Sequence, residues 1–301
     1  MFRKIRSRSN RSACWATESD PAARLAGAAR RVDVITLGGT DRGLFASDIH
    51  LDDHDPATAR LFFEMLAREA PGATHLFLLG DLFEAWVGDD DDSAVGQQLL
   101  HALARLSGAG LKVYLMRGNR DFLLDVPHPP PAAAPKPSPQ VLEPACYSAR
   151  AGASLLPDPC RISLFGVSTL LSHGDLLCVD DTRYQAFRAQ SRSASWQQAF
   201  LAQPLADRQS LARAMREQSQ REKSDKLDAL MDVNAKAVRD AMHEAGAAQM
   251  IHGHTHRPAR HLEPAGAGTL RWVLPDWDAH SGRAGMLLAL AGEMRRLGNW
   301  D

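Results

Sequence analysis

The chain has 301 residues, enough to bury one large core or two smaller ones. Its apolar (45%) and charged (24%) fractions are ordinary for a soluble globular protein, and a net charge of −1 provides no global field that would attract nucleic acid or a membrane. The four cysteines form no Cys-x-x-Cys pair, which indicates reduced thiols in the cytosol, and no stretch approaches the ~20 apolar residues of a spanning helix.

Residues 1–31 are rich in arginine, serine and alanine, and five basic residues precede the first acid, Glu18. This composition is typical of a disordered tail. It also fits an organelle transit peptide, or upstream sequence that the mature protein does not use. We expect a tail without chemistry.

The elements that follow alternate between strand and helix, which predicts an α/β fold with stacked layers. Strands are expected at 42–47, 75–79 and 111–116. One helix should begin at Pro56, where proline suits the first helical position, and another should lie near 94–106.

Four consecutive aspartates occupy positions 89–92, just before the second of these helices. Adjacent carboxylates rarely converge on one ion. We therefore interpret the run as a solvated helix N-terminus that the helix dipole favours, and not as a metal site.

Two short strands are expected at 161–165 and 168–171, and residues 182–231 have a helical pattern with aromatic side chains among many basic ones. This helical segment is either a cap that stabilises the fold or a lid that binds substrate, and the sequence leaves both open. An apolar and basic surface would suit an amphiphilic anion. A helix capped by Asp232 then runs to Ala245.

The chain ends with a predicted strand at 250–252 and closing strands at 269–273 and 286–290. The domain organisation that we expect has these parts: a basic, disordered extension at 1–42, a single domain at 43–290 with a proline-rich inserted loop at 126–144 and a helical lid at 182–231, and a C-terminal tail at 291–301.

Oxygen and nitrogen donors directly follow five of the predicted strands, where the ligand sites of open α/β sheets gather. Alternation along the chain puts Asp48 and His50 on one face, so that both can hold one metal ion. The Asn119 amide can ligate a metal without adding charge. The full set of candidate metal ligands is Asp48, His50, Asp81, Asn119, His173, His254 and His256.

This donor set suits two divalent cations, and mixed Asp, Asn and His ligands favour Mn²⁺, Fe²⁺ or Zn²⁺ over Ca²⁺. Two ions about 3.5–4 Å apart can clamp a phosphoryl group and activate water at neutral pH. We expect Asp81 to be the bridge. The predicted grouping is Asp48, His50, Asp81 and His256 on one ion, and Asp81, Asn119, His173 and His254 on the other.

These motifs resemble the calcineurin-like metallophosphoesterase superfamily, and within it most closely the UDP-2,3-diacylglucosamine diphosphatases of lipid A biosynthesis. The resemblance runs from about Gly43 to Leu290. The stretches that carry it are Ser47-Asp48-Ile49-His50-Leu51, Leu79-Gly80-Asp81-Leu82-Phe83-Glu84-Ala85-Trp86, Gly118-Asn119-Arg120-Asp121, His173-Gly174-Asp175, Asp180-Asp181-Thr182-Arg183-Tyr184 and Gly253-His254-Thr255-His256-Arg257-Pro258.

The resemblance implies a four-layer αββα sandwich with a helical lid that holds the acyl chains. It implies hydrolysis of UDP-2,3-diacylglucosamine to UMP and 2,3-diacylglucosamine 1-phosphate (lipid X), with two Mn²⁺ ions and water attacking the α-phosphorus. It also implies peripheral attachment to the cytoplasmic face of the bacterial inner membrane. Carried over by position, the catalytic residues are Asp81, Asn119, Arg120 and His254, and the substrate contacts are Asn119, Arg120, Asp181, Tyr184, Arg216, Ser219, Lys226 and His254.

Arg120 supports pyrophosphate cleavage without the resemblance. Many members of the superfamily have a histidine here, which can act as a general acid for an alkoxide leaving group. An arginine stays protonated, but it can bind phosphate bidentately, so the leaving group must already be good. The alternatives left open are that Arg120 only forms a surface salt bridge, that the enzyme is another phosphodiesterase or a nuclease, and that the chain is a non-enzymatic scaffold.

Overall fold

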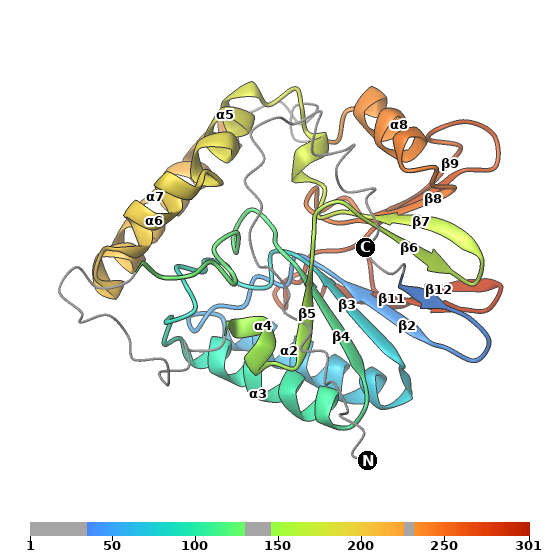
Figure 1. Cartoon of the computed structure of the whole chain (residues 1–301), viewed down its shortest axis with the longest axis horizontal. Coiled ribbons are helices and arrows are strands. Elements are labelled where there is room, and N and C mark those ends of the chain that lie inside the picture. Colours follow the sequence, from blue (N-terminus) through green and yellow to red (C-terminus); the bar gives the residue numbers. More distant parts are fainter. Residues whose placement is uncertain (1–34, 130–145, 226–231) are drawn as a thin grey trace, which may run out of the picture.

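The computed structural model describes residues 35–129, 146–225 and 232–301, with the side chains of 218–225 excepted. In this part of the chain, two six-stranded β-sheets face each other (Figure 1). The first sheet has the order β1 (Thr36–Leu37), β6 (Cys160–Leu164), β7 (Val167–Leu171), β8 (Gln249–His252), β10 (Leu270–Val273) and β9 (Ala259–Leu262). The second has the order β12 (Glu293–Asn299), β11 (Ala284–Leu290), β2 (Gly43–Ala46), β3 (His75–Leu79), β4 (Lys112–Met116) and β5 (Ala153–Leu156).

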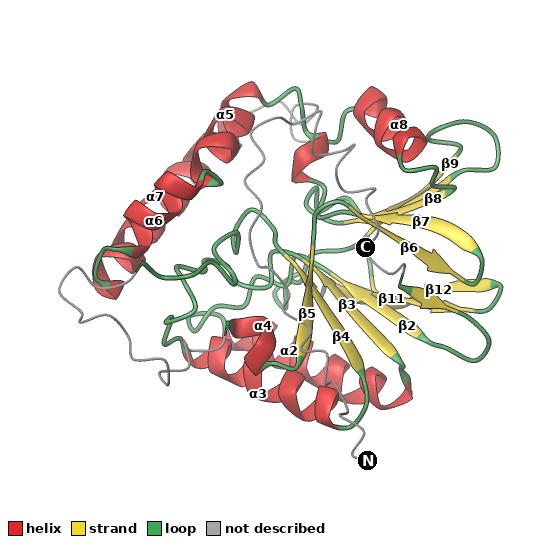
Figure 2. Ribbon diagram, viewed as in Figure 1, coloured by secondary structure: helices red, strands yellow, loops and turns green. Residues whose placement is uncertain are grey.

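Helices cover the outer face of each sheet, as Figure 2 shows. Helices α2 (Pro56–Glu69) and α3 (Ala94–Gly108) and the short α4 (Tyr147–Arg150) lie along the second sheet, and α8 (Ala235–Glu244) lies on the first. Short 3₁₀ turns occupy Ala70–Gly72 and Asp175–Leu177. The predicted four-layer α/β sandwich is therefore confirmed.

Strand β3 shows how the sequence specifies the two interfaces. Successive side chains of a strand point to opposite faces. Leu76 and Leu78 pack in the hydrophobic cluster between the second sheet and helices α2 and α3, whereas Phe77 and Leu79 pack between the two sheets. The Phe77 ring stacks on Phe45, with centroids 4.6 Å apart. Both faces are covered, so the strand is apolar throughout, which is typical of buried parallel strands.

Residues 182–225 form three helices, α5 (Thr182–Ser191), α6 (Ala194–Leu201) and α7 (Leu205–Asp225), which stand together at one side of the molecule (Figure 1). Phe200 and Leu201 are buried in the same cluster as Leu76 and Leu78. The Arg192 guanidinium donates to the Gly118 carbonyl at 2.8 Å. We call these helices the lid, and their contacts attach it to the loop that carries Asn119.

The aspartate run at 89–92 differs from its interpretation as a solvated helix N-terminus. The first amides of α3 donate instead to the Asp53 carboxylate, at 2.8 and 2.9 Å. Asp91 is only 6% exposed, and Asp90 forms an ion pair with Arg208 of the lid. The run therefore attaches the lid to the sandwich.

Both predicted domain ends also differ from the structure. The expected C-terminal tail forms β12, which pairs antiparallel with β11 along its whole length, and Trp300 is buried between the sheets. The expected disordered extension to residue 42 includes β1, where Leu37 is fully buried. Charged side chains on β12 and the two-residue length of β1 conceal these edge strands in the sequence.

Two further expectations concern the ends of other segments. Asn234, and not Asp232, caps α8, because its side chain accepts hydrogen bonds from the amides of residues 236 and 237. The predicted proline-rich loop at 126–144 lies outside the described residues from position 130. None of the helices in the described part of the chain has an apolar stretch of the length that crossing a bilayer needs.

Candidate active site

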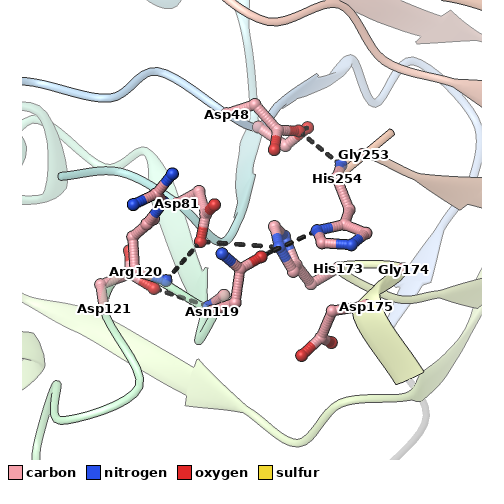
Figure 3. A network of polar contacts seen from close by, with 12 residues as sticks. Asp48, Asp81, Asn119, Arg120, Asp121, His173, Gly174, Asp175, Gly253 and His254 are labelled. Carbon is pink, nitrogen blue, oxygen red and sulfur yellow. Dashed lines mark hydrogen bonds and ion pairs between the residues drawn. The ribbon is translucent and has the colours of Figure 1, made fainter. Parts of the chain in front are cut away.

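Seven donor side chains gather where strands of both sheets end. Strands β2, β3 and β4 are parallel neighbours in the second sheet, and β7 and β8 are parallel neighbours in the first. Each is followed directly by one or two of the predicted ligands. Figure 3 shows Asp81, Asn119, His173 and His254 turned toward one another, with Asp48 close by. The sequence-predicted donors are thus brought to one place.

The first group of ligand atoms comes from Asp48, His50 and His256, which lie within 4.8 Å of one another. The Nε2 atoms of His50 and His256 are 3.2 Å apart. His256 Nε2 also lies 3.4 Å from the Oδ1 atom of Asp48. Two imidazoles and one carboxylate therefore point at a common position.

The second group comes from Asp48, Asp81 and His173, again within 4.8 Å. His173 Nε2 lies 3.5 Å from Asp81 Oδ1. The Asn119 Oδ1 atom lies 2.9 Å from His173 Nε2 and 2.8 Å from His254 Nδ1, which adds Asn119 and His254 to this side.

The carboxylate common to both groups is Asp48, whereas the sequence predicts Asp81 as the shared ligand. Asp81 belongs to the second group alone. Its Oδ1 atom accepts a hydrogen bond from the Arg120 backbone amide at 2.8 Å, which turns it toward the loop after β4. Asp48 is fully buried between the two groups.

Positive φ angles are concentrated at these ligands. Non-glycine residues rarely adopt the left-handed region, and such conformations cluster at functional sites at a cost of roughly 1–3 kcal/mol each. Of eight such residues in the described chain, five are candidate ligands. They are Asp48 (52°), His50 (53°), Asp81 (51°), His254 (71°) and His256 (53°).

Two glycines let the loops approach these carboxylates closely. A Cβ atom at Gly118 would collide with the Asp81 carboxylate, and one at Gly253 would collide with the Asp48 carboxylate and the Ser47 hydroxyl. At this close approach, the His254 backbone amide donates a hydrogen bond to Asp48 Oδ2 at 2.8 Å. These positions therefore require glycine for space.

We expect Gly253→Ala to weaken metal binding at least tenfold and to destabilise the fold by about 1–3 kcal/mol, as overpacked buried positions do. Gly108→Ala is the matched control, because a Cβ there meets no atom within 4 Å. Thermal unfolding and a Mn²⁺ titration measure the two effects. Equal behaviour of both variants would contradict the close approach.

The donor set fits a pair of transition-metal ions. Asp48 Oδ1 is buried and has no hydrogen-bond donor, and two imidazole nitrogens face each other beside it. A cation between them satisfies all three atoms. Carboxylate, amide and imidazole donors together suit Mn²⁺, Fe²⁺ or Zn²⁺.

The acidic surroundings shift the imidazoles toward their charged forms. Burial disfavours the imidazolium of His256, but the Asp276 and Asp48 carboxylates outweigh burial and raise its pKa to about 10. Burial is likewise outweighed at His173, where Asp81 and Asp48 raise the pKa to about 9. Burial favours the neutral acid at Asp48, yet these imidazoles hold its pKa well below the usual range.

Mn²⁺ affinity is accordingly expected to rise with pH. Both raised pKa values mean that His173 and His256 are protonated at neutral pH in the metal-free protein, so that a metal must displace two protons. The gain is about tenfold per pH unit for each proton released, and it ends as the pH passes 9 and then 10. Calorimetric titration in buffers of different ionisation enthalpy counts the protons. An affinity that stays constant from pH 6.5 to 8.5 would refute this account.

The structure gives the predicted substrate-binding residues different surroundings. Arg120 and Arg216 both reach Glu84, with Arg120 Nη1 4.0 Å from its carboxylate and Arg216 in a direct ion pair. Tyr184 donates its hydroxyl to Asp175, and its ring centroid lies 6.1 Å from that of His254. These three side chains therefore lie around the site.

Asp181, Ser219 and Lys226 do not gain the same support. Asp181 caps α5 by accepting the Tyr184 amide hydrogen at 3.0 Å. Ser219 belongs to α7, but its side chain is not described, and Lys226 lies outside the described residues. Substrate contact by these three residues stays a prediction.

Asp121 is a supporting residue that sequence reasoning missed. Its buried carboxylate accepts from the amides of Gly118 and Leu82, at 2.6 and 2.7 Å, and so ties the loop after β4 to the loop after β3. Burial, together with the charge of Asp81, raises its pKa to about 6. Its place two residues after Asn119 in a ligand loop was the available signal.

Two facing sheets, with carboxylates, imidazoles and an amide at the strand ends, define a metallophosphoesterase. The model of the calcineurin-like phosphoesterase family matches residues 42–258. The chain is therefore an enzyme of this metal-dependent class.

Three curated relatives narrow the assignment from this class of enzymes to one family. All three are named UDP-2,3-diacylglucosamine hydrolase. The one from Chromobacterium violaceum is 46% identical over 254 residues, covering 84% of this chain and 97% of the relative. The one from Stenotrophomonas maltophilia is 45% identical over 242 residues (78% and 90%), and the one from Cellvibrio japonicus is 42% identical over 259 residues (86% and 98%). The chain belongs to the UDP-2,3-diacylglucosamine hydrolase family.

Proposed function

We propose that this enzyme hydrolyses the pyrophosphate bond of UDP-2,3-diacylglucosamine, to give UMP and 2,3-diacylglucosamine 1-phosphate in lipid A biosynthesis. The observation that carries the proposal is the meeting of two ligand groups with two arginines, Arg120 and Arg216, at the same strand ends. The relatives named for this substrate support it.

Asp48, His50 and His256 would hold one Mn²⁺ ion, and Asp81, Asn119, His173 and His254, together with Asp48, would hold the other. Such a pair, when bound, polarises the phosphoryl oxygens and lowers the pKa of water. In the proposed reaction, water would attack the α-phosphorus, and 2,3-diacylglucosamine 1-phosphate would leave. Other divalent transition metals suit the same donors.

The two arginines complete the chemistry for a pyrophosphate. Their guanidinium groups stay charged and can bind phosphate oxygens in pairs. Neither can protonate an alkoxide, but a phosphate leaving group needs little protonation, because its second pKa is roughly 6. The site therefore suits a pyrophosphate better than a monoester.

Peripheral contact with the inner membrane is part of the same proposal, since the substrate is a lipid. Phe200 of α6 is only 5% exposed and Trp196 stacks on it, so these aromatic side chains pack inward. Leu211 of α7 is exposed among arginines and is the better candidate for lipid contact. Vesicle co-sedimentation that is equal for wild type and Leu211→Glu would remove α7 from the proposal.

The direct test is release of UMP from UDP-2,3-diacylglucosamine with and without added Mn²⁺. We expect Mn²⁺-dependent turnover of the lipid nucleotide, and at least 100-fold lower kcat/KM on bis(p-nitrophenyl) phosphate. Equal turnover of both substrates would favour a general phosphodiesterase or nuclease instead. A folded protein that binds no Mn²⁺ and stays inactive on both substrates when Mn²⁺ is added would overturn the proposed metal-dependent hydrolysis.

A further inference from the structure

A carboxylate lies beside the Nδ1 atom of each imidazole in the first ligand group. His50 Nδ1 lies 2.8 Å from Glu84 Oε2, and His256 Nδ1 lies 3.3 Å from Asp276 Oδ2. The Nε2 atoms of the same two rings point inward and are 3.2 Å apart. The two rings are therefore held in the same way, with one nitrogen toward a carboxylate and the other toward the metal position.

This arrangement determines which ring nitrogen faces the metal position. A carboxylate beside Nδ1 favours the proton on that nitrogen in a neutral imidazole, fixes the ring orientation and leaves Nε2 for the metal. Once a metal has displaced the second proton of His256, both rings present a lone pair on Nε2, and these lone pairs and the Asp48 carboxylate face one point.

The second ligand group lacks this feature. The Nδ1 atom of His173 lies 3.0 Å from the Leu79 backbone carbonyl, which carries no net charge. His254 turns its Nδ1 atom inward, to Asn119 Oδ1 at 2.8 Å. Among the four candidate ligand histidines, His50 and His256 are thus the two whose Nδ1 atoms face a carboxylate.

An arginine also pairs with each supporting carboxylate. Arg283 binds Asp276 through Nε at 2.7 Å and Nη2 at 2.9 Å. Arg216 binds Glu84, and it comes from α7 of the lid. The lid is therefore joined to a candidate metal ligand through one carboxylate.

We propose that Glu84 and Asp276 are positioning residues that fix His50 and His256 for metal binding, so that loss of either one weakens one metal position and leaves the other intact. Glu84 has the further role of connecting that position to Arg216 of the lid. The inference rests on the proposed two-metal site, but it does not depend on which phosphoester is cleaved.

The test is a Mn²⁺ titration of the full-length, metal-stripped protein. Electron paramagnetic resonance and calorimetry monitor the binding. Wild type should bind two ions. Glu84→Ala and Asp276→Ala should each bind one of the two ions 10–100-fold more weakly, as loss of a ligand's hydrogen-bond partner does, and the other within threefold of wild type. The readout is binding, so it does not require a substrate.

Matched controls separate positioning from charge and packing. Asp52 also lies near Arg216, at 3.7 Å, but it supports no imidazole, so Asp52→Ala should bind Mn²⁺ like wild type. Asp278, two residues after Asp276 and bonded to the His280 amide, gives the second control as Asp278→Ala. Glu84→Gln keeps an acceptor oxygen and should regain part of the affinity, whereas Glu84→Leu fills the space alone and should not.

Wild-type affinities in both alanine variants, equal weakening of both ions, or equal loss in Asp52→Ala would overturn the proposal. A variant that fails to unfold cooperatively is replaced by its isosteric counterpart, Glu84→Gln or Asp276→Asn, in which a partial loss at one position is still required. If wild type binds two ions but does not cleave the lipid nucleotide, the proposed substrate fails while this inference stands.

Discussion

Replacing Asp81 by alanine is expected to lower kcat for the lipid nucleotide by at least 10³-fold, a loss of about 4 kcal/mol of transition-state stabilisation. The carboxylate is 2% exposed, lies 3.5 Å from His173 Nε2 and belongs to the second ligand group. Its removal deletes a candidate metal ligand and leaves the Arg120 backbone amide without the oxygen to which it donates. Initial rates at saturating Mn²⁺ measure the effect.

The control is Asp240→Ala, which removes an exposed carboxylate on the surface of α8. In the described part of the chain, this carboxylate forms an ion pair with Lys236. It should retain wild-type activity. Thermal unfolding of both variants shows whether the fold survives. Activity of Asp81→Ala above a tenth of wild type, in a folded protein, would mean that Asp81 holds no catalytic metal.

Arg120→Ala should lower kcat/KM by about 10²–10³-fold, the loss that follows removal of one preorganised donor to a developing charge. The Arg120 side chain is 13% exposed beside Glu84, and its backbone amide binds Asp81, so that the loop fixes its position. Arg120→Lys keeps the charge but not the paired donors, and it should recover only part of the rate.

Arg105→Ala on the exposed surface of α3 is the matched control and should change kcat/KM less than twofold. The same assay on a phosphomonoester tests the leaving-group argument. If Arg120→Ala stays within threefold of wild type, Arg120 is only a surface ion-pair former. Efficient monoester hydrolysis by wild type would contradict the pyrophosphate preference.

The fold was predictable wherever apolar alternation and strand length were strong. β3, with Leu76 and Leu78 on one face and Phe77 and Leu79 on the other, is apolar throughout and ends at a glycine. Edge strands gave weaker signals. β12 carries three charged side chains among its seven residues, and its pairing with β11 decides its structure.

The candidate site was predictable as a set of donors because each follows its strand directly in the sequence. The division of the histidines and Asn119 between the two groups also follows the predicted one, but the carboxylate common to both groups does not. That Asp48 is common to both groups depends on how far the loop after β8 reaches toward β2, where Gly253 lies against Asp48. Likewise, Glu84 and Asp276 gain a role only because the fold places them behind His50 and His256.

Anomalous diffraction from crystals grown with Mn²⁺ tests the two-metal centre most directly. We expect two peaks about 3.5–4 Å apart, one within coordination distance of His50 and His256 and the other of Asn119 and His173, with at least one carboxylate between them. A single peak, or two peaks bound elsewhere on the protein, would contradict it.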